Sequence, residues 1–376
     1  MPSGGRRILI IGGGFSGMSA AIALRRQGAD VDIVEVDAGW RNYGAGISLG
    51  PATLRAFRRL DILEAFLEHG SATDNVELRL PHGPIVATLP TPRLAGADVP
   101  GGGAIMRPVL ARILANATRA AGANVRLGCT FTALDQQDDG VEVTFTDGQR
   151  GRYDLVVGAD GLNSKTRAAV FPDAPHPAYT GQAVWRAVLP RTPEITTVTM
   201  WVGQPVKPGV NPVSRAEMYM FITEARPTNA HVETNELAPG MRALLATFPD
   251  PLLQSIRGQI GPDSQIVFRP IESLLMPQPW FRGRVVLIGD TVHATTPHLA
   301  SGACIGIEDA LVLAEQLDAQ QDVDAALESF QNRRWDRCRM VVENSLRLGE
   351  IEIAGGDKDE HARIMRDSMI ALAQPC

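Results

Sequence analysis

The residues best suited to chemistry lie near the start of the chain, where an apolar run leads into the pattern Gly12-x-Gly14-x-x-Gly17. Gly12 permits a tight turn, Gly14 lets the backbone approach phosphate oxygens without a Cβ atom, and Gly17 lets the next helix pack closely against the strand. Phe15 and Ser16 are assigned to the same site, and a helical pattern follows from Met18 to Gln27; the free N–H groups and dipole at the start of that helix favour an anion. The pattern predicts a binding site for a dinucleotide pyrophosphate.

An acidic residue follows at the distance that such a site needs. Glu35 ends a second apolar strand, Val31–Glu35, about 20 residues beyond the glycines, where a carboxylate can accept hydrogen bonds from ribose hydroxyls. Val36 comes next and is assigned to the same site. The alternative, a glycine-rich turn without a ligand, does not account for strand, glycines, helix and acid in this order.

Two later segments have the same strand-to-turn form. The strand Tyr153–Gly158 runs into Asp160, and the strand that begins at Gly283 ends at Gly289 and Asp290. In open α/β sheets, ligands lie outside the carboxyl ends of the strands, so these segments predict one shared cofactor site. Asp160 and Asp290 have a structural alternative, because an aspartate in a loop often caps a turn.

Composition excludes several function classes. A chain of 376 residues with a net charge of −6 has room for two or three lobes, and it has no basic block of the kind that binds nucleic acid or an anionic membrane. No apolar stretch approaches the roughly 18 residues needed to span a bilayer. Cysteines 129, 304, 338 and 376 lack metal or redox spacing, so we expect no metal and a reducing, cytoplasmic location.

The middle of the chain has strand-like composition. β-Branched and aromatic residues predict strands at 183–189, 198–202, 217–222 and 265–268. Between them we expect a turn-rich connection at 203–212 and a helix at 241–258, and after them helices at 304–317, 325–350 and 358–373.

The three glycine and aspartate motifs, in this order and spacing, resemble those of the single-component flavin-dependent aromatic hydroxylases, the group A flavoprotein monooxygenases with the fold of para-hydroxybenzoate hydroxylase. The resemblance implies an α/β fold, with a Rossmann-like FAD-binding domain of the GR2 type, an inserted mixed β-sheet substrate domain and C-terminal helices. The expected segments are 1–72 (FAD-binding Rossmann part), 73–178 (its continuation with a small sheet insertion), 179–276 (substrate sheet), 277–320 (return to the FAD domain) and 321–376 (C-terminal helices).

The resemblance also implies roles for individual residues toward a non-covalent FAD. Glu35 would hold the ribose, Arg107 would contact the FAD, and Asp290 with Gly289 would bind the ribityl or pyrophosphate part. Asp160 would take part in handling the cofactor and the pyridine nucleotide. A surface position at the start of a helix is the alternative for Arg107.

The stretch after the Gly-Asp motif departs from the family pattern, because Ala300-Ser-Gly-Ala-Cys304 stands where many members have Gly-Gln-Gly. Backbone N–H groups of Gly302 and Ala303 at a helix N-terminus would still face the flavin and stabilise negative charge on it. The resemblance sets Ala45, Gly46 and Pro297 beside the reactive edge of the ring.

The substrate pocket is expected between the sheet and that edge, lined by Ser48 and Pro297. Tyr219 and His298 are the candidate catalytic residues, since either side chain can hydrogen-bond a ring oxygen; packing is the alternative for Tyr219. Trp185 and Arg186 are adjacent on one strand and face opposite sides, so at most one enters the pocket. Arg186 would suit a carboxylate and Trp185 an aromatic face.

The family reaction is hydroxylation of a small aromatic or N-heteroaromatic substrate with NAD(P)H and O2, through a flavin C4a-hydroperoxide and in some members with decarboxylation. No second GxGxxG pattern is present, so NAD(P)H is expected to dock only transiently. The alternatives are a flavin oxidase or reductase without oxygen insertion, and a flavin-loaded protein that binds a ligand without turnover. The C-terminal helices are candidates for a homodimer contact.

Overall fold

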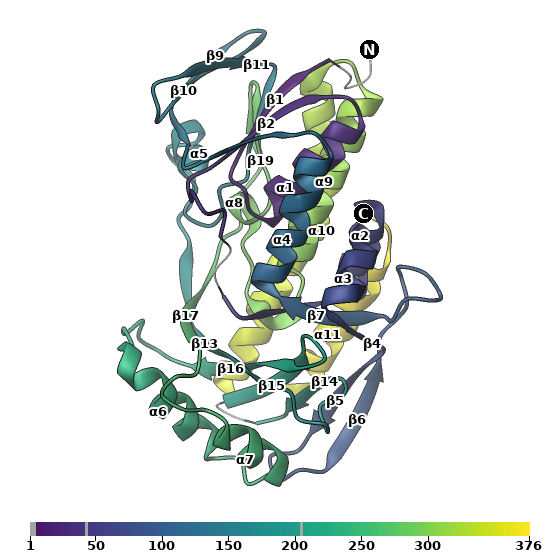
Figure 1. Ribbon diagram of the computed structural model, residues 1–376, viewed down its shortest axis with the longest axis vertical. Helices are drawn as coiled ribbons and strands as arrows, with labels where there is room; N and C mark the ends of the chain where they lie inside the picture. The colour runs from purple at the N-terminus through teal and green to yellow at the C-terminus, as the bar shows by residue number, and fades with distance from the viewer. Residues whose placement is uncertain (1–4, 42–43, 204–205) are drawn as a thin grey trace.

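The computed structural model describes residues 5–41, 44–203 and 206–376, and two large sheets dominate it. Figure 1 shows a six-stranded sheet in the upper part of the molecule and a seven-stranded sheet across the lower part. The 32-residue helix α10 (Val323–Ala354) runs alongside both. The predicted fold class, an α/β FAD-domain fold with a mixed-sheet domain and C-terminal helices, is confirmed.

The six-stranded sheet has the order β18-β19-β12-β1-β2-β8, and every neighbouring pair except β18 with β19 is parallel. Its central strands are continuous apolar runs, because helices cover both faces of a parallel sheet. The strands are β1 (Arg7–Ile11), β2 (Asp30–Glu35), β8 (Asn124–Leu127), β12 (Leu155–Gly158), β18 (Phe281–Arg282) and β19 (Val285–Leu287).

The helices of this part follow the strands in the expected order. Helix α1 packs against both α4 and α9. The helices are α1 (Phe15–Arg26), α4 (Arg107–Ala120), α5 (Lys165–Val170), α8 (Asp290–His293) and α9 (Gly302–Ala319).

The seven-stranded sheet has the order β17-β13-β16-β15-β14-β5-β6 and is antiparallel except for the parallel pair β14 and β5. Helices α6 (Thr234–Leu245) and α7 (Pro251–Gly258) cover its outer face and form a separate apolar core with it. The strands are β5 (Asn75–Arg79), β6 (Ile85–Pro90), β13 (Ala178–Pro190), β14 (Val198–Trp201), β15 (Val206–Pro212), β16 (Glu217–Ala225) and β17 (Ile266–Ser273).

Two three-stranded sheets and four further helices complete the described part of the fold. The sheet β3-β7-β4 packs on β15 and β16 and thus joins the two halves of the molecule, while the sheet β9-β10-β11 extends from the top. These elements are β3 (Gly46–Leu49), β4 (Ser71–Thr73), β7 (Gly102–Met106), β9 (Phe131–Gln137), β10 (Gly140–Phe145), β11 (Arg150–Tyr153), α2 (Pro51–Arg59), α3 (Leu63–His69), the 3-10 helix η1 (Pro297–Leu299) and α11 (Lys358–Ala373).

Two expectations for the middle of the chain are wrong. The segment expected as a turn-rich connection contains β15, an interior strand, because pairing with β16 along its whole length outweighs the turn tendency of its glycine and prolines. The helix expected at 241–258 is two helices, since Asp250 starts α7 by accepting a hydrogen bond from Leu252 N.

The segment boundaries given by the sequence remain a prediction. Strands β5 and β6 come from the 73–178 segment yet lie in the same sheet as β13 to β17, so this sheet draws on two segments. None of the helices in the described ranges has the length and apolar character needed to cross a membrane.

Candidate functional site

Three neighbouring strands of the upper sheet end at one edge. Because β12, β1 and β19 are parallel, Ile11, Gly158 and Leu287 all lie at their carboxyl ends. Each strand leads toward a helix: α1 after β1, α5 after β12 and α8 after β19. The sequence motifs therefore meet at this edge.

The three glycines of the first motif have different surroundings. Gly12 has φ +107°, and a Cβ there would lie 2.4 Å from the carbonyl oxygen of Ala159. A Cβ on Gly17 would lie 2.0 Å from the oxygen of Gly12, whereas Gly14 has nothing within 4 Å of that position. Packing thus requires the outer two glycines, and the middle one borders open space of the kind a pyrophosphate would fill.

The N-terminus of α1 is open to an anion. Gly14 is the N-cap, no side chain caps the helix, and Phe15 and Ser16 form its first turn. The Ser16 side chain points away from the open space and fits against two other glycines, since a Cβ on Gly289 or Gly306 would come within 2.4 or 2.3 Å of its Oγ. Backbone N–H groups of α1 are therefore available to bind an anion here.

Glu35 is held at the end of β2 beside this loop. Its Oε2 accepts a hydrogen bond from Gly13 N at 2.7 Å and its Oε1 accepts one from Asp37 N at 2.8 Å. Trp40 Nε1 donates to the Gly13 oxygen at 2.8 Å and braces the same loop. Each carboxylate oxygen keeps a further lone pair for a ribose hydroxyl. Val36 is 70% exposed, so its side chain adds no packing.

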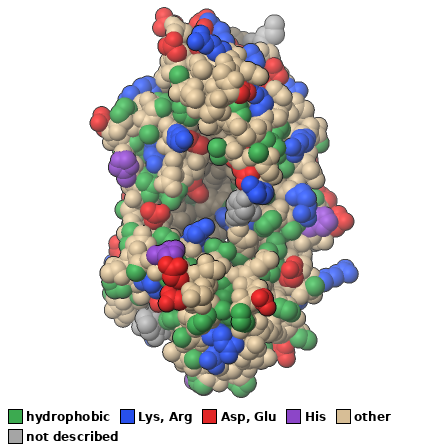
Figure 2. Space-filling view, turned by 60° about the vertical axis from the view of Figure 1, so that its left-hand side comes forward, with side chains coloured by type: hydrophobic (Ala, Val, Ile, Leu, Met, Phe, Trp, Pro, Cys, Tyr) green, Lys and Arg blue, Asp and Glu red, His purple; other side chains and the backbone are tan. Residues whose placement is uncertain are grey.

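The centre of this edge is hollow. Figure 2 shows a deep depression at mid-height, above the seven-stranded sheet, with both cationic and anionic atoms around it. Asp290, which follows β19 at this edge, is exposed, and no described residue hydrogen-bonds its carboxylate. The protein around it desolvates the carboxylate and raises the pKa of Asp290, while the charges of His293 and Arg107 oppose the rise. The carboxylate caps no turn and is available to a ligand.

Arg107 is the first residue of α4. Its guanidinium carbon lies 5.5 Å from the centre of the Phe15 ring, and the guanidinium makes no hydrogen bond to a described residue, whereas the backbone N–H of Arg107 donates to Ala45 O at 3.0 Å. Desolvation and the nearby Arg186 lower the pKa of Arg107, whereas Asp290 raises it. Because these charges affect one another, Arg107, Arg186 and Asp290 belong to one electrostatic site.

Asp160 has a structural role. Its Oδ2 accepts hydrogen bonds from Thr166 N and Thr166 Oγ1, both at 3.0 Å, and its Oδ1 accepts one from Ser164 Oγ. The carboxylate thereby closes the turn that starts α5, which is the alternative that the sequence left open. A direct cofactor contact by this carboxylate remains a prediction.

The segment after α8 returns to the hollow through η1 and α9. Pro297 begins η1, and Ala300 ends it in the left-handed region with φ +48°. Helix α9 then starts at Gly302 with no side-chain cap, so backbone N–H groups at Gly302 and Ala303 are free to bind an acceptor. This geometry suits the expected stabilisation of negative charge on a flavin.

His298 does not lie where the sequence suggested. Its side chain is only 1% exposed and faces Glu352 of α10, with Nε2 3.4 Å from a carboxylate oxygen. Its Nδ1 forms a hydrogen bond with Thr296 Oγ1 at 2.8 Å. The predicted substrate contact and catalytic role of His298 are contradicted, because the ring is enclosed between η1 and the C-terminal helices.

The alternation of β13 decides between Trp185 and Arg186. Trp185 is 3% exposed and packs into the core under α6 and α7, with Nε1 donating to Glu224 Oε2 at 2.9 Å. The predicted substrate contact of Trp185 is therefore wrong. Arg186 faces the other way, and its Nε donates to the Tyr219 hydroxyl at 3.1 Å. Arg186 and Tyr219 thus form one polar pair on the inner face of the sheet.

Strand β3 brings the upper part of the molecule against this pair. Gly46 lies against Tyr219, since a Cβ on Gly46 would be 2.5 Å from the Tyr219 Cβ, and Ala45 belongs to the same apolar cluster. Asn211 Nδ2 donates a hydrogen bond to Ser48 Oγ. Sequence reasoning missed Asn211, because it lies in the segment read as a turn. A strand reading of 206–212 would have put Asn211 on the same face as Tyr219.

A buried charged cluster supports the site from behind. His293 Nε2 lies 2.5 Å from Asp309 Oδ2, and Arg334 Nε donates to Asp309 Oδ1 at 2.7 Å. His293, Asp309 and Cys338 offer ligand atoms within 4.8 Å of one another, but the guanidinium of Arg334 already neutralises Asp309. We interpret the cluster as the structural support of the loop that carries Asp290.

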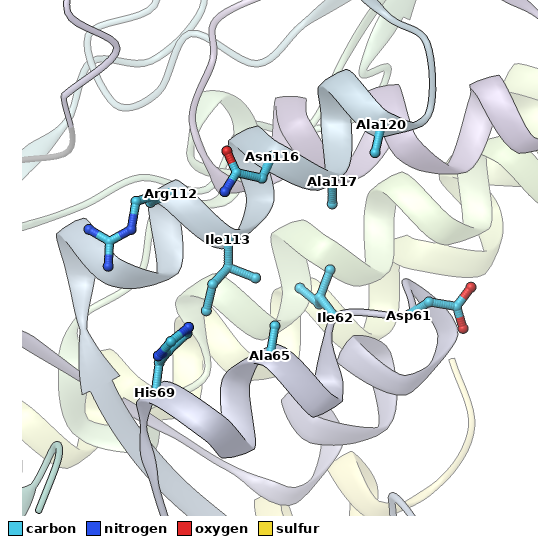
Figure 3. A pocket seen from close by; sticks show the side chains of 9 residues that line it. All are labelled: Asp61, Ile62, Ala65, His69, Arg112, Ile113, Asn116, Ala117 and Ala120. Carbon is cyan, nitrogen blue, oxygen red and sulfur yellow. The ribbon is translucent and has the colours of Figure 1, made fainter.

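A second, shallow groove of about 320 Å³ lies between α3 and α4. In Figure 3 its apolar floor is formed by Ile62, Ala65 and Ile113, with His69 and Arg112 at one end. None of the residues predicted for the cofactor or substrate lines it.

Comparisons with known proteins agree with this geometry. The family described as "FAD binding domain" matches residues 6–345. The chain is 31% identical over 358 residues to the aurachin C monooxygenase/isomerase of Stigmatella aurantiaca, covering 92% of this chain and 90% of that protein. It is 28% identical over 353 residues to a FAD-dependent urate hydroxylase of Klebsiella pneumoniae, covering 89% and 88%.

A solved structure gives the same result in three dimensions. The crystal structure of Klebsiella pneumoniae HpxO in complex with FAD and uric acid has a TM-score of 0.82 and 26% sequence identity, covering 98% of this chain and 93% of that one. The cofactor of this fold is FAD, and the open space over Gly14, the uncapped helices and Glu35 fit it.

Proposed function

The chain belongs to the group A FAD-dependent monooxygenases, and on that premise we propose that it uses NAD(P)H and O2 to hydroxylate a small aromatic or N-heteroaromatic anion. The relatives named above include urate hydroxylases, and urate is a heteroaromatic compound that carries negative charge at neutral pH. Both facts support the general substrate class.

The observation that carries the proposal is the pair of Arg186 and Tyr219 opposite Arg107. The guanidinium of Arg186 lies close enough to lower the pKa of Arg107, whereas Asp290 and Tyr219 raise it. The phenol hydroxyl of Tyr219 accepts from Arg186 Nε, which leaves the terminal N–H groups of Arg186 for a ligand. Such a site favours an anion, since two cations with one carboxylate leave a net positive charge.

In the proposed site, different residues would bind the cofactor and the substrate. Glu35, the α1 N-terminus, Arg107 and Asp290 would hold FAD, which when bound supplies hydride acceptance and oxygen activation. Arg186 would orient the substrate through a carboxylate or ring oxygen. Tyr219 would hydrogen-bond a ring hydroxyl and favour its deprotonation, which makes the ring a better nucleophile. The apolar side chains packed around Tyr219, among them Met106, Val188 and Phe221, would keep water from the reacting atoms.

The test uses the purified yellow holoenzyme. Aromatic acids, hydroxypyridines and oxidised purines are screened for stimulated oxidation of NADH and of NADPH, and the products are analysed after reaction under labelled dioxygen. We expect at least one anionic compound to gain one labelled oxygen atom. Its neutral amide or methyl ester should show a KM about tenfold or more above that of the acid.

Other outcomes identify the alternatives. Stimulated oxidation that yields hydrogen peroxide and an oxidised product without labelled oxygen supports a flavin oxidase or reductase. A compound that binds without accelerating flavin reduction supports a binding protein. Product analysis also reports whether a carboxylate leaves as hydroxylation occurs.

A further inference from the structure

The loop that carries Pro297 is anchored to the C-terminal helices by two adjacent side chains. Leu299 packs with Leu348 and Ile351 of α10 and with Ile364 of α11 in one apolar cluster. His298 lies next to this cluster and faces Glu352 of α10. Helices α10 and α11 lie side by side, and Figure 1 shows α10 reaching down to the seven-stranded sheet.

Glu352 joins four elements. Its Oε2 lies 3.4 Å from His298 Nε2 of η1, and its Oε1 lies 3.1 Å from His361 Nε2 of α11 and pairs with Lys207 Nζ of β15. Glu352 itself is on α10 and its side chain is 17% exposed. The carboxylate of Glu352 thus links the loop that carries Pro297, the seven-stranded sheet and both C-terminal helices.

A missing Cβ makes room for the His298 ring. Gly349 lies in the interior of α10, where glycine costs about 1 kcal/mol relative to alanine. A Cβ on Gly349 would lie 2.9 Å from His298 Cε1 and 2.7 Å from Gln182 Oε1. The absence of a side chain at Gly349 therefore leaves space on the surface of α10 into which the His298 ring packs.

The protonation of the ring agrees with this arrangement. Burial lowers the pKa of His298, although Glu352 opposes the shift, so the imidazole is neutral near pH 7. Nδ1 of His298 forms a hydrogen bond with Thr296 Oγ1, and Nε2, which has no hydrogen-bond partner of ordinary geometry among the described residues, lies 3.4 Å from the Glu352 carboxylate. Thr296 thus hydrogen-bonds one side of the ring, and the carboxylate of Glu352 lies against the other.

We propose that Glu352 is a positioning residue for the flavin, which holds η1 through His298 and so fixes the uncapped N-terminus of α9. The inference rests on the proposed location of the flavin ring beside Pro297 and Gly302. It assigns the C-terminal helices, which touch neither cofactor nor substrate in the proposed site, a part in setting the flavin environment.

The test compares Glu352→Gln with the wild type as FAD-loaded protein. We expect the dissociation constant for FAD to rise about tenfold, and the visible spectrum and midpoint potential of the bound flavin to shift, because the α9 N-terminus loses its fixed position. Glu352→Asp should restore part of both properties. The matched control is Glu360→Gln, which breaks the exposed pair of Glu360 with Arg347 on the same two helices and should leave the flavin unchanged.

A purely structural role for Glu352 gives another result. Glu352→Gln would then lower the melting temperature while FAD binds with unchanged affinity, spectrum and potential, and the proposal would be overturned. Should Glu352→Gln not fold, His298→Asn carries the test with the same readouts, and an unchanged flavin in that variant overturns the proposal as well. These readouts need no substrate, so a failure to find hydroxylation leaves them fully interpretable.

Discussion

At the scale of single residues, the site depends on a few polar groups with defined partners. Arg186 and Tyr219 form one pair, the charge of Asp290 acts on Arg107, and His293 pairs with Asp309. His298 belongs to a different group, since its partner is Glu352. In the proposed site, similar residue types would therefore bind substrate, bind cofactor or support the fold according to the partner that each one meets.

Tyr219→Phe should weaken the binding of an anionic substrate. The change removes the oxygen that accepts from Arg186 Nε, so the guanidinium loses its fixed orientation. A charge-assisted hydrogen bond contributes about 1.5–3 kcal/mol, so we expect KM to rise about tenfold or more. Steady-state kinetics measure KM, and FAD binding should stay unchanged. Tyr179→Phe is the control, since its hydroxyl donates to Arg226 O on the same sheet; an equal effect in both variants would contradict the prediction.

The pair of His293 and Asp309 predicts a pH dependence of stability. Burial alone would lower the pKa of His293, but the Asp309 carboxylate raises it well above the ordinary value of 6.5. A group whose pKa is raised by folding stabilises the protein fully below its unfolded pKa and loses this contribution as pH rises through the folded pKa. The free energy of unfolding should therefore fall as pH rises above 6.5.

Urea denaturation between pH 6 and pH 9 measures this effect, with His293→Asn as the comparison. The variant should be less stable at pH 6 and should lack the part of the decline that comes from this titration. A wild type and a variant with parallel pH profiles would show that His293 is not protonated in the folded protein.

At the scale of elements, the segment that joins β1 to the first turn of α1 contains both a closely packed glycine, Gly17, and a glycine that borders open space, Gly14. The N-terminus of α1 must approach β1 at Gly17 and must leave room at Gly14. The same kind of separation occurs along β13, where adjacent residues face a packed core and a polar site.

Gly14→Ala and Gly17→Ala should have different effects. A Cβ at Gly14 meets no protein atom within 4 Å, so the apoprotein should keep its stability while FAD binding weakens tenfold or more. A Cβ at Gly17 would lie 2.0 Å from Gly12 O, so the apoprotein itself should lose about 2 kcal/mol. Urea denaturation of the apoproteins and FAD titration distinguish the two. Normal FAD affinity in Gly14→Ala would argue against a phosphate at this position.

Trp185→Phe and Arg186→Met test the two faces of β13. Trp185→Phe should lower the stability by about 1–2 kcal/mol, because it removes a hydrogen bond to Glu224 and core contacts, and should leave KM unchanged. Arg186→Met should keep the fold and raise KM for an anionic substrate. The reverse pattern of effects would mean that the substrate lies on the outer face.

At the scale of the whole molecule, buried charges hold the cofactor half together. Arg334 of α10 binds Asp309 and Glu308 of α9, and Glu308 also pairs with Arg337 of α10 and Arg55 of α2. Helix α10 then continues to the seven-stranded sheet. The cluster therefore fixes the long helix relative to the cofactor edge.

Arg334→Met should destabilise the protein by about 3–5 kcal/mol, because the buried carboxylates of Asp309 and Glu308 would each lose one of their cationic partners. Arg339→Met on the same helix is the control, since Arg339 pairs only at the surface with Asp336 and Glu343 and should cost less than about 1 kcal/mol. Urea denaturation compares the two. A small effect at Arg334 would mean that the cluster relaxes or admits water.

The local motifs of this protein were determined by the sequence alone. The strand before Gly12, the helix after it, Glu35 at the end of β2 and the N-cap at Ser164 all depend on residues within one strand-turn-helix unit. Their geometry follows from glycine conformations and helix ends, which short-range interactions decide. The cofactor and the family could be predicted for this reason.

Only the tertiary structure decided which side chains meet. Trp185 and Arg186 alternate in any strand, but the packing of α6 and α7 chose which of them is buried. Residues 206–212 form a strand because β16 pairs with them. The His298 ring packs against Gly349 and Glu352, which are about 50 residues away in the sequence, and not at the expected substrate position. These outcomes depend on contacts between distant segments, whose energies no local pattern contains.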